Sequence, residues 1–302
     1  MKKTILITGS NGLLGQKLIK LIAFSPDYDL IATSVGENRF PSVKGYTYHS
    51  LDITNPQKVK ECFAEFQPQV VINTAAMTNV DSCEDNQDGC WDLNVNAVDY
   101  LVTESNKCKA HFIHLSTDFI FDGEEGPYAE DSFANPLSFY GKSKLASEEI
   151  VKNKCHSWAI ARTILVYGIC DNMSRSNIVL WAREALKNGK PINIVMDQFR
   201  TPTLAEDLAA GCKLLMDSKT KGVFNIGGDD FMSILELVER IADFYKLDKS
   251  IINSISSDTL NQRAQRPKKT GILLEHSKKI LGYKPHSFEE GLEILEIQSP
   301  LF

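Results

Sequence analysis

An apolar run, a glycine-rich turn and an amphipathic segment follow one another at the start of the chain, and this order strongly limits its fold. Residues 4–8 have the composition of a buried strand, and residues 13–23 carry apolar side chains at helical spacing. Between them, Gly9 permits a tight turn, Gly12 lets the backbone approach a phosphate, and Gly15 lets the helix pack closely on the sheet. Free N–H groups at the start of the helix would face the pyrophosphate of a dinucleotide; the alternative is a turn that binds no ligand. The residues that we predict to bind this cofactor are Gly9, Asn11, Gly12, Leu13, Leu14 and Gly15.

Apolar runs continue to alternate with helical patterns through the first half of the chain. Further strands are predicted at residues 30–33, 46–49, 70–73, 112–115 and 159–162. Helices are predicted from Pro56, which follows the capping residue Asn55, and at residues 90–106 and 140–152. Because this alternation produces a parallel sheet covered on both faces, we predict an α/β fold with a Rossmann-type doubly wound parallel sheet. Ligands bind such sheets at the carboxyl ends of the strands.

The regular alternation weakens after residue 165. Helices are predicted at residues 177–188, 204–216 and 234–245, with a strand at residues 223–226. Residues 197–203 are predicted to form a loop, and residues 254–270 are mostly polar. We therefore predict a dinucleotide-binding domain over residues 1–165 and a smaller C-terminal substrate-binding lobe over residues 166–302, with some chain crossing back to the first domain.

Composition and charge argue against several classes of protein. Charged residues make up 24% of the 302 residues, and the net charge of −6 argues against a general nucleic-acid binder. Apolar stretches are too short to cross a bilayer, and the run after the first lysines is too short for an export signal. Seven scattered cysteines without a C-x-x-C pair, and histidines without H-x-x-x-H spacing, predict free, mostly buried thiols and no metal site. We predict a cytoplasmic protein that binds neither nucleic acid nor membrane.

A phenol and an amine stand four residues apart in the helix predicted at residues 140–152. Tyr140 and Lys144 therefore share one face of that helix. Reduction of a ketone needs a proton on oxygen, and the nearby ammonium of Lys144 would lower the pKa of the Tyr140 phenol and ease that transfer. Thr117, with Ser116 beside it, would bind the substrate carbonyl at the end of the fifth strand. Together with the glycine turn, these residues predict a nicotinamide-dependent carbonyl reductase.

The type of nicotinamide depends on the residues that follow the second strand. That strand ends without a carboxylate, which would bind the adenosine ribose and disfavour a 2′-phosphate. Thr33, Ser34 and Arg39 could instead bind a phosphate, so we predict NADPH, with NADH possible. Asp52 and Ile53 are predicted to lie near the adenine, although an aspartate in the turn before a helix is an equally plain interpretation.

Several longer motifs accompany the glycine turn and the Tyr140–Lys144 pair. Residues 116–123 read STDFIFDG, residues 73–81 read NTAAMTNVD, residues 197–203 read DQFRTPT, and residues 264–267 read AQRP. Together these segments resemble the extended short-chain dehydrogenase/reductase family, and within it the dTDP-4-dehydrorhamnose reductases, whose corresponding motifs are S-T-D-Y-V-F-D-G, N-x-A-A-Y-T-x-V-D, D-Q-x-G-x-P-T and A-x-R-P. The resemblance covers nearly the whole chain.

The resemblance implies roles for individual residues. Thr117, Tyr140 and Lys144 take the catalytic positions, Ala75 and Ala76 flank the cofactor, and Asn94 matches a structural asparagine. The implied reaction is NADPH-dependent reduction of the 4-keto group of dTDP-4-dehydrorhamnose to dTDP-L-rhamnose by a possible homodimer. The residues expected at the nucleotide-sugar substrate are Thr78, Ser116, Asp118, Gln198, Arg200 and Arg266.

Two departures from the pattern leave alternatives open. Arg200 and Thr201 replace the usual glycine and its neighbour, and Met77 replaces a tyrosine. The alternatives are a reductase or epimerase of another nucleotide sugar, or a cofactor-binding regulatory subunit without chemistry. Arg162 is predicted to be a structural ion-pair partner, and His114 a core histidine.

Overall fold

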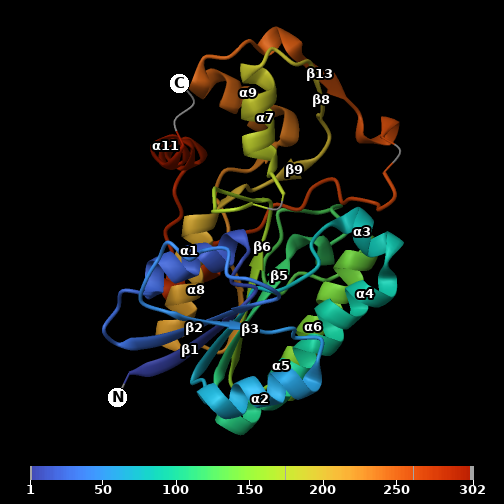
Figure 1. Ribbon diagram of the computed structural model, residues 1–302. Coiled ribbons are helices and arrows are strands. Elements are labelled where there is room, and N and C mark those ends of the chain that lie inside the picture. The colour runs from blue at the N-terminus through green and yellow to red at the C-terminus, as the bar shows by residue number, and fades with distance from the viewer. Residues whose placement is uncertain (1, 174, 261, 300–302) are drawn as a thin grey trace.

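A seven-stranded parallel sheet forms the centre of the molecule (Figure 1). The structure is a computed structural model that describes residues 2–173, 175–260 and 262–299. The strands, in spatial order, are β11 (Gly222–Asn225), β6 (Trp158–Thr163), β5 (His111–Thr117), β4 (Val70–Asn73), β1 (Lys3–Thr8), β2 (Tyr28–Ser34) and β3 (Thr47–Ser50). The chain order reverses between β1 and β4, and ligands of such sheets bind at this reversal. The predicted α/β fold and doubly wound parallel sheet are confirmed.

Helices cover both faces of the sheet because successive strand residues point to opposite sides (Figure 1). On one face, Ile5 and Ile7 pack with residues of α1 (Leu13–Ile22) and α8 (Ala205–Ser218). On the other face, Leu6 packs in a second cluster with residues of α2 (Pro56–Phe66), α5 (Ala97–Cys108) and α6 (Phe139–Lys154). As predicted, Asn55 caps α2, accepting hydrogen bonds from the two N–H groups at positions 57 and 58.

The helix predicted at residues 90–106 is interrupted by a wider turn. It consists of α4 (Gln87–Trp91), a π-helical turn over Asp92–Asn96 and α5. The extra residue of a π turn redirects a side chain. Asn94 lies in this turn, and its amide holds both the N–H and the carbonyl of Met77 (2.8 and 3.0 Å).

A third apolar cluster lies among elements that follow residue 165, at the top of Figure 1. Its helices are α7 (Ile178–Lys187), α9 (Ile234–Tyr245) and α11 (Phe288–Gln298), beside the parallel pair β8 (Ile192–Val195) and β13 (Ile252–Ile255). By contrast, α8 and β11 belong to the layers of the central sheet although they also follow residue 165. The remaining helices are α3 (Val80–Asp85) and α10 (Glu275–Leu281), with 3-10 turns at Asp118–Ile120, Lys249–Ile251 and Ser257–Thr259.

Several short strands fall in segments predicted to be irregular. The expected loop at residues 197–203 contains β9 (Phe199–Arg200) and the first residue of β10 (Thr203–Leu204). Their partners are β12 (Met232–Ser233) and β7 (Val166–Tyr167). Two-residue strands arise from tertiary pairing and leave no alternating pattern in the sequence.

The structure bears on the predictions about the cysteines and about membrane-spanning segments. The seven cysteines are free thiols, five of them buried, as predicted. In the part of the chain that the structure describes, no helix combines the length and apolarity required for a membrane span.

Candidate active site

A cavity of about 940 Å³ opens at the carboxyl ends of the central strands. Its wall includes the glycine turn, the segment after β4, the end of β5, and the helix face that carries Tyr140 and Lys144. Many of the predicted residues therefore meet at one place, as the topology requires. Those lining the cavity are Gly9, Asn11, Gly12, Leu13, Leu14, Gly15, Ala76, Thr78, Ser116, Thr117, Asp118, Tyr140, Lys144 and Arg200. Those outside its lining are Arg39, Asp52, Ile53, Ala75, Gln198 and Arg266.

The glycine turn leaves no room for side chains at two of its positions. Gly9 has φ +71°, and a Cβ there would lie 2.7 Å from the backbone nitrogen of Ala75. A Cβ on Gly15 would lie 2.5 Å from the carbonyl oxygen of Gly9. Gly12 occupies the N-cap of α1 and has no side chain to cover the first N–H groups. The turn therefore fits a dinucleotide phosphate, which needs close backbone approach and free N–H donors.

The loop after β2 lies against the glycine turn. Asn11 donates to the carbonyl oxygen of Glu37 (2.8 Å) and accepts from the backbone N–H of Arg39 (2.9 Å). Arg39 is thus held beside the turn that would bind the cofactor. The hydroxyl of Thr33 is buried and donates to the carbonyl oxygen of Ile7 (3.1 Å), so it cannot also donate to a phosphate as predicted.

Asp52 and Ile53 take structural positions before α2. One carboxylate oxygen of Asp52 accepts from the N–H and the hydroxyl of Thr54 (3.0 and 2.7 Å). Ile53 is buried in the cluster beneath α2 and α5. The structure therefore places Asp52 as an aspartate in the turn before a helix, which was one of the two interpretations. Contact of Asp52 and Ile53 with the adenine stays a prediction.

The first turns of α6 place Tyr140 and Lys144 in the wall of the cavity. Ser138 caps the helix by accepting from the N–H of Gly141 (3.2 Å). Gly141 itself packs so closely on the carbonyl of Phe119 that a Cβ could not fit. Tyr140 and Lys144 are 8% and 3% exposed, so both groups are largely withdrawn from water before any ligand is bound.

Burial opposes the predicted effect of Lys144 on the phenol. Burial raises the pKa of Tyr140 above its usual value, and the charge of nearby Asp118 raises that pKa further. A hydrogen bond with Thr117 lowers the pKa but does not outweigh burial. Burial also lowers the pKa of Lys144 to about 8. Burial therefore sets the net direction of the Tyr140 pKa shift, and the lowering of that pKa by the Lys144 ammonium stays a prediction. Tyr140 is a neutral phenol that retains its proton at neutral pH.

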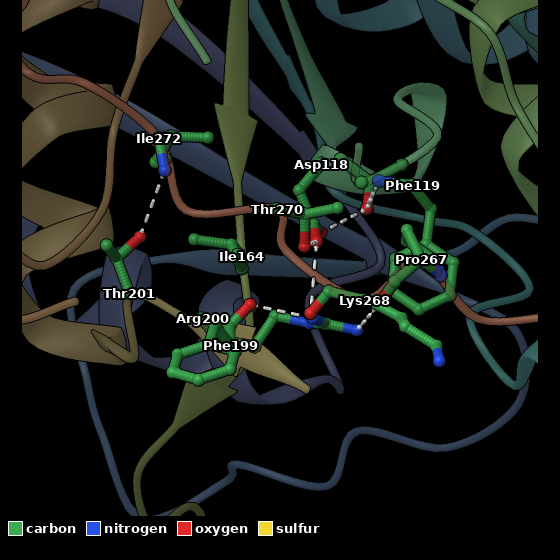
Figure 2. A network of polar contacts seen from close by, with 12 residues as sticks. Asp118, Phe119, Ile164, Phe199, Arg200, Thr201, Pro267, Lys268, Thr270 and Ile272 are labelled. Atoms are coloured by element: carbon green, nitrogen blue, oxygen red, sulfur yellow. Dashed lines mark hydrogen bonds and ion pairs between the residues drawn. The ribbon is translucent and has the colours of Figure 1, made fainter. Parts of the chain in front are cut away.

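Asp118 lines the cavity, but its carboxylate already has partners inside the protein (Figure 2). It accepts from the hydroxyls of Thr117 (3.0 Å) and Thr270 (2.5 Å), and lies 3.9 Å from Nε of Arg200. Burial raises the pKa of Asp118, and the charge of Arg200 opposes that shift. The carboxylate therefore orients Thr117 and lies beside the buried guanidinium of Arg200.

The guanidinium of Arg200 is also bound by the backbone (Figure 2). Its Nη1 donates to the carbonyl oxygens of Phe199 (2.7 Å) and Lys268 (3.1 Å), and its Nη2 donates to that of Pro267 (2.8 Å). Arg200 is 4% exposed, yet it lines the cavity. It therefore places a fixed positive charge at the cavity wall.

Arg266 is held at the edge of the site by a carboxylate. Its two Nη atoms donate to the two oxygens of Asp81 (3.2 and 2.7 Å), and this pairing lowers the pKa of Asp81. Gln198 is buried outside the cavity, and its backbone carbonyl oxygen accepts from the backbone N–H of Ile234. Neither side chain lines the cavity directly.

The cavity wall also contains residues that the sequence did not single out. Arg175 lines it and donates to the hydroxyl of Thr78 (3.3 Å), although the loop before α7 carried no motif. Thr74 and the segment 163–166 also line it. The position of the segment could have been inferred, because it directly follows a central strand.

Two residues set aside as structural have clear partners. Arg162 forms a buried bidentate pair with Glu148 (2.9 and 2.8 Å), as predicted. His114 is buried in the core, and its ring also contacts Lys144. Within residues 2–173, 175–260 and 262–299, no three His, Cys, Asp or Glu side chains are grouped so as to hold a metal ion.

The fold and the cavity together define a class of protein. A doubly wound parallel sheet brings a glycine-rich phosphate turn to the same cavity as a tyrosine, a lysine and a threonine suited to carbonyl chemistry. This is an NAD(P)H-dependent oxidoreductase of the extended short-chain dehydrogenase/reductase type.

Comparisons with known proteins identify the family. The chain belongs to the RmlD substrate binding domain family, which it matches over residues 1–297. It is similar to a solved dTDP-4-dehydrorhamnose reductase from Clostridium acetobutylicum, with TM-score 0.87, 30% identity and coverage of 98% of this chain and 99% of that one. A dTDP-4-dehydrorhamnose reductase from Bacillus anthracis, solved in complex with NADP, has TM-score 0.84, 27% identity and coverage of 99% and 100%. The bovine methionine adenosyltransferase 2 subunit beta is 30% identical over 88% of this chain and 79% of the relative.

Proposed function

We propose that this protein reduces the 4-keto group of dTDP-4-dehydrorhamnose to give dTDP-L-rhamnose, with NADPH as the cofactor. The observation that carries the proposal is the convergence of Thr117, Tyr140 and Lys144 with the glycine turn on one cavity. The similarity to two dTDP-4-dehydrorhamnose reductases over nearly the whole chain supports this choice of substrate.

The cofactor would occupy the part of the cavity at the glycine turn. Gly9, Gly12 and Gly15 would hold its pyrophosphate against the start of α1. Arg39, fixed beside the turn, would bind the 2′-phosphate that distinguishes NADPH. Lys144 would hold the nicotinamide ribose. When bound, the nicotinamide supplies a hydride to the carbonyl carbon. The residues proposed to flank the cofactor further are Ala75, Ala76, Asp52 and Ile53.

Proton delivery to the carbonyl oxygen would come from Tyr140. Its buried phenol keeps its proton at neutral pH, as a general acid must. Thr117 lies at the adjacent strand end, where its hydroxyl would orient the same carbonyl. In this structure the Thr117 hydroxyl donates to Asp118, so binding of the substrate would exchange that hydrogen bond for one to the carbonyl.

The substrate's diphosphate needs positive charge at the other side of the cavity. Arg200 supplies a fixed charge there, although three backbone carbonyls already occupy its donors. Arg266 would reach a diphosphate only by exchanging its pair with Asp81. We propose that Thr78 and Ser116 contact the sugar nucleotide from the cavity wall, with Gln198 and Asp118 supporting it from behind.

Two alternatives have specific support. Arg200 stands where the reductase pattern has glycine, which favours a different nucleotide sugar. The similarity to the bovine methionine adenosyltransferase 2 subunit beta supports the alternative of a subunit of a larger enzyme. The intact Tyr140 and Lys144 argue for catalysis.

The test is the oxidation of NADPH in the presence of dTDP-4-dehydro-L-rhamnose generated in situ, beside an NADH control. We expect turnover with the wild type, and a loss of at least ~100-fold in Tyr140→Phe with NADPH affinity nearly unchanged, since the phenol acts as the acid. Full activity in Tyr140→Phe would refute the mechanism. Bound NADPH without turnover would favour another nucleotide sugar or the regulatory role, and equal rates with NADH would remove the role of Arg39.

A further inference from the structure

The loop that joins β7 to α7 carries Arg175 into the wall of the cavity. This loop is fixed at two places. The side-chain amide of Gln16 in α1 holds both the backbone N–H and the carbonyl oxygen of Asp171 (2.8 Å each). Asn177, which caps α7, donates to the carbonyl oxygen of Gly168 (2.8 Å). Arg175 lies two residues before this cap, so its backbone is tied to the fold beside the cavity.

The guanidinium of Arg175 has donors to spare. Its Nη2 donates to the hydroxyl of Thr78 at 3.3 Å, and no carboxylate pairs with it among the residues that the structure describes. Arg175 is also exposed. One hydroxyl uses only one of the several N–H groups of a guanidinium. Arg175 therefore offers a positive charge and open donors to a ligand in the cavity.

The other cations near the cavity are already engaged. Among the described residues of the wall, the other charged side chains are Lys144, Arg200 and Asp118. Arg200 donates to three backbone carbonyls and lies beside Asp118 (Figure 2). Lys144 would hold the nicotinamide ribose in the proposed function, and Arg266 stands outside the lining with both Nη atoms on a carboxylate. A further anion in the cavity would thus find its open donors at Arg175.

The contact with Thr78 places Arg175 away from the glycine turn. Thr78 follows β4 and directly precedes Asn79, which caps α3. The next turn of chain carries Asp81, which binds Arg266 of the C-terminal segment. The pyrophosphate of a dinucleotide would instead meet the N–H groups at the start of α1, which bind it without a guanidinium. Arg175 therefore faces the part of the cavity left for the substrate.

We propose that Arg175 binds the diphosphate of the nucleotide-sugar substrate. A guanidinium can donate two parallel hydrogen bonds to phosphate oxygens, a geometry that an ammonium cannot match. Binding would exchange the neutral hydroxyl of Thr78 for charged acceptors, which form stronger hydrogen bonds. The inference rests on the proposed function for the class of substrate, and it does not depend on which sugar the nucleotide carries.

Two substitutions separate the charge of Arg175 from its geometry. Arg175→Gln removes the charge, whereas Arg175→Lys keeps the charge and loses the paired donors. Arg263→Gln is the matched control, because Arg263 is also exposed, pairs with the exposed Asp85, and does not line the cavity. Thermal unfolding of the three variants would establish that each one folds.

The measurement is calorimetric titration of the protein, saturated with NADP⁺, with dTDP and with UDP. We expect Arg175→Gln to weaken binding of the nucleoside diphosphate by at least ~10-fold, the usual effect of a hydrogen bond to a charged group. Arg175→Lys should bind with an affinity between those of Arg175→Gln and the wild type. Arg263→Gln should bind like the wild type. NADPH affinity, measured by fluorescence titration, should be the same in all four proteins.

The outcomes separate this inference from the proposed function. If Arg175→Gln and Arg263→Gln bind dTDP and UDP equally well, or if the wild type binds neither, the inference fails. A loss of NADPH affinity alone would assign Arg175 to the pyrophosphate of the cofactor and would also overturn it. If the wild type binds dTDP through Arg175 but does not reduce dTDP-4-dehydrorhamnose, the proposed function fails and the inference stands.

Discussion

Burial moves the proton affinities of Tyr140 and Lys144 in opposite directions, and both shifts favour the uncharged form. The phenol holds its proton more strongly, and the amine loses its proton more easily, with a pKa of about 8. A neutral phenol can give its proton to a developing alkoxide, and an amine near its pKa can adjust its charge at little cost. The charge states that the proposed roles of these two residues need would therefore be set by the environment that α6 and β5 build around them.

Lys144→Met should make the protein more stable at pH 7 while abolishing its activity. Folding at that pH withdraws a charged amine from water, and methionine avoids this cost, by on the order of 1–3 kcal/mol. Between about pH 8 and 10.5 the unfolded chain binds more protons than the folded one at this site, so wild-type stability rises with pH and the advantage of methionine shrinks.

Urea unfolding of wild type and Lys144→Met at pH 7 and pH 10 measures this effect. Lys142→Met is the control, because Lys142 is exposed on the same helix and its substitution should change stability by less than about 0.5 kcal/mol. A variant that is less stable than the wild type at pH 7 would contradict the burial cost.

At the scale of elements, the glycine turn links β1 to α1 and packs against the segment after β4. Gly9→Ala should destabilise the fold by about 1–2 kcal/mol, because φ +71° is unfavourable for alanine. It should also weaken NADPH binding more than tenfold, since the new Cβ would displace the backbone of Ala75 beside the phosphate turn.

Gly189→Ala separates the two effects of that substitution. Gly189 has φ +63°, and a Cβ there meets no atom of the described residues within 4 Å. We expect thermal unfolding to show a loss of about 1 kcal/mol and NADPH titration to show unchanged affinity. Equal NADPH affinities in Gly9→Ala and Gly189→Ala would exclude the steric role of Gly9.

The predictability of each element followed from where its stabilising contacts lie. The central strands and their helices have local apolar periodicity, and Asn55 with Pro56 signals the start of α2, so these were predicted. The two-residue strands and the π turn depend on partners far away in the sequence, such as the bonds of Asn94 to Met77. The motifs brought Thr117, Tyr140 and Lys144 together correctly, but they could not reveal that Asp118 and Arg266 have charged partners of their own.

At the scale of the whole molecule, one segment near the C-terminus connects separate walls of the cavity. Arg266 bonds to Asp81 of α3, the carbonyls of Pro267 and Lys268 accept from Arg200, and Thr270 bonds to Asp118. These hydrogen bonds join residues that lie between 67 and 185 positions apart in the sequence. The shape of the cavity therefore depends on these ties as well as on the central sheet.

Asp81→Asn should weaken the interaction of Asp81 with Arg266 and lower the free energy of unfolding by about 1 kcal/mol at pH 7. Asp81 accepts from both Nη atoms of Arg266 and from the N–H of Ala264, and an amide keeps neither the charge nor both acceptors. Its pKa is lowered in the folded protein, so its contribution is present above its ordinary value of 3.8 and is lost as the pH falls through the folded value. The free energies of unfolding of the wild type and the variant should therefore converge in acid when urea unfolding is followed from pH 7 downward.

Asp85→Asn is the matched control, since Asp85 pairs with Arg263 where both side chains are exposed, and it should cost less than about 0.5 kcal/mol. An equal loss in both variants would mean that Arg266 and Asp81 do not fasten this segment to the cavity wall.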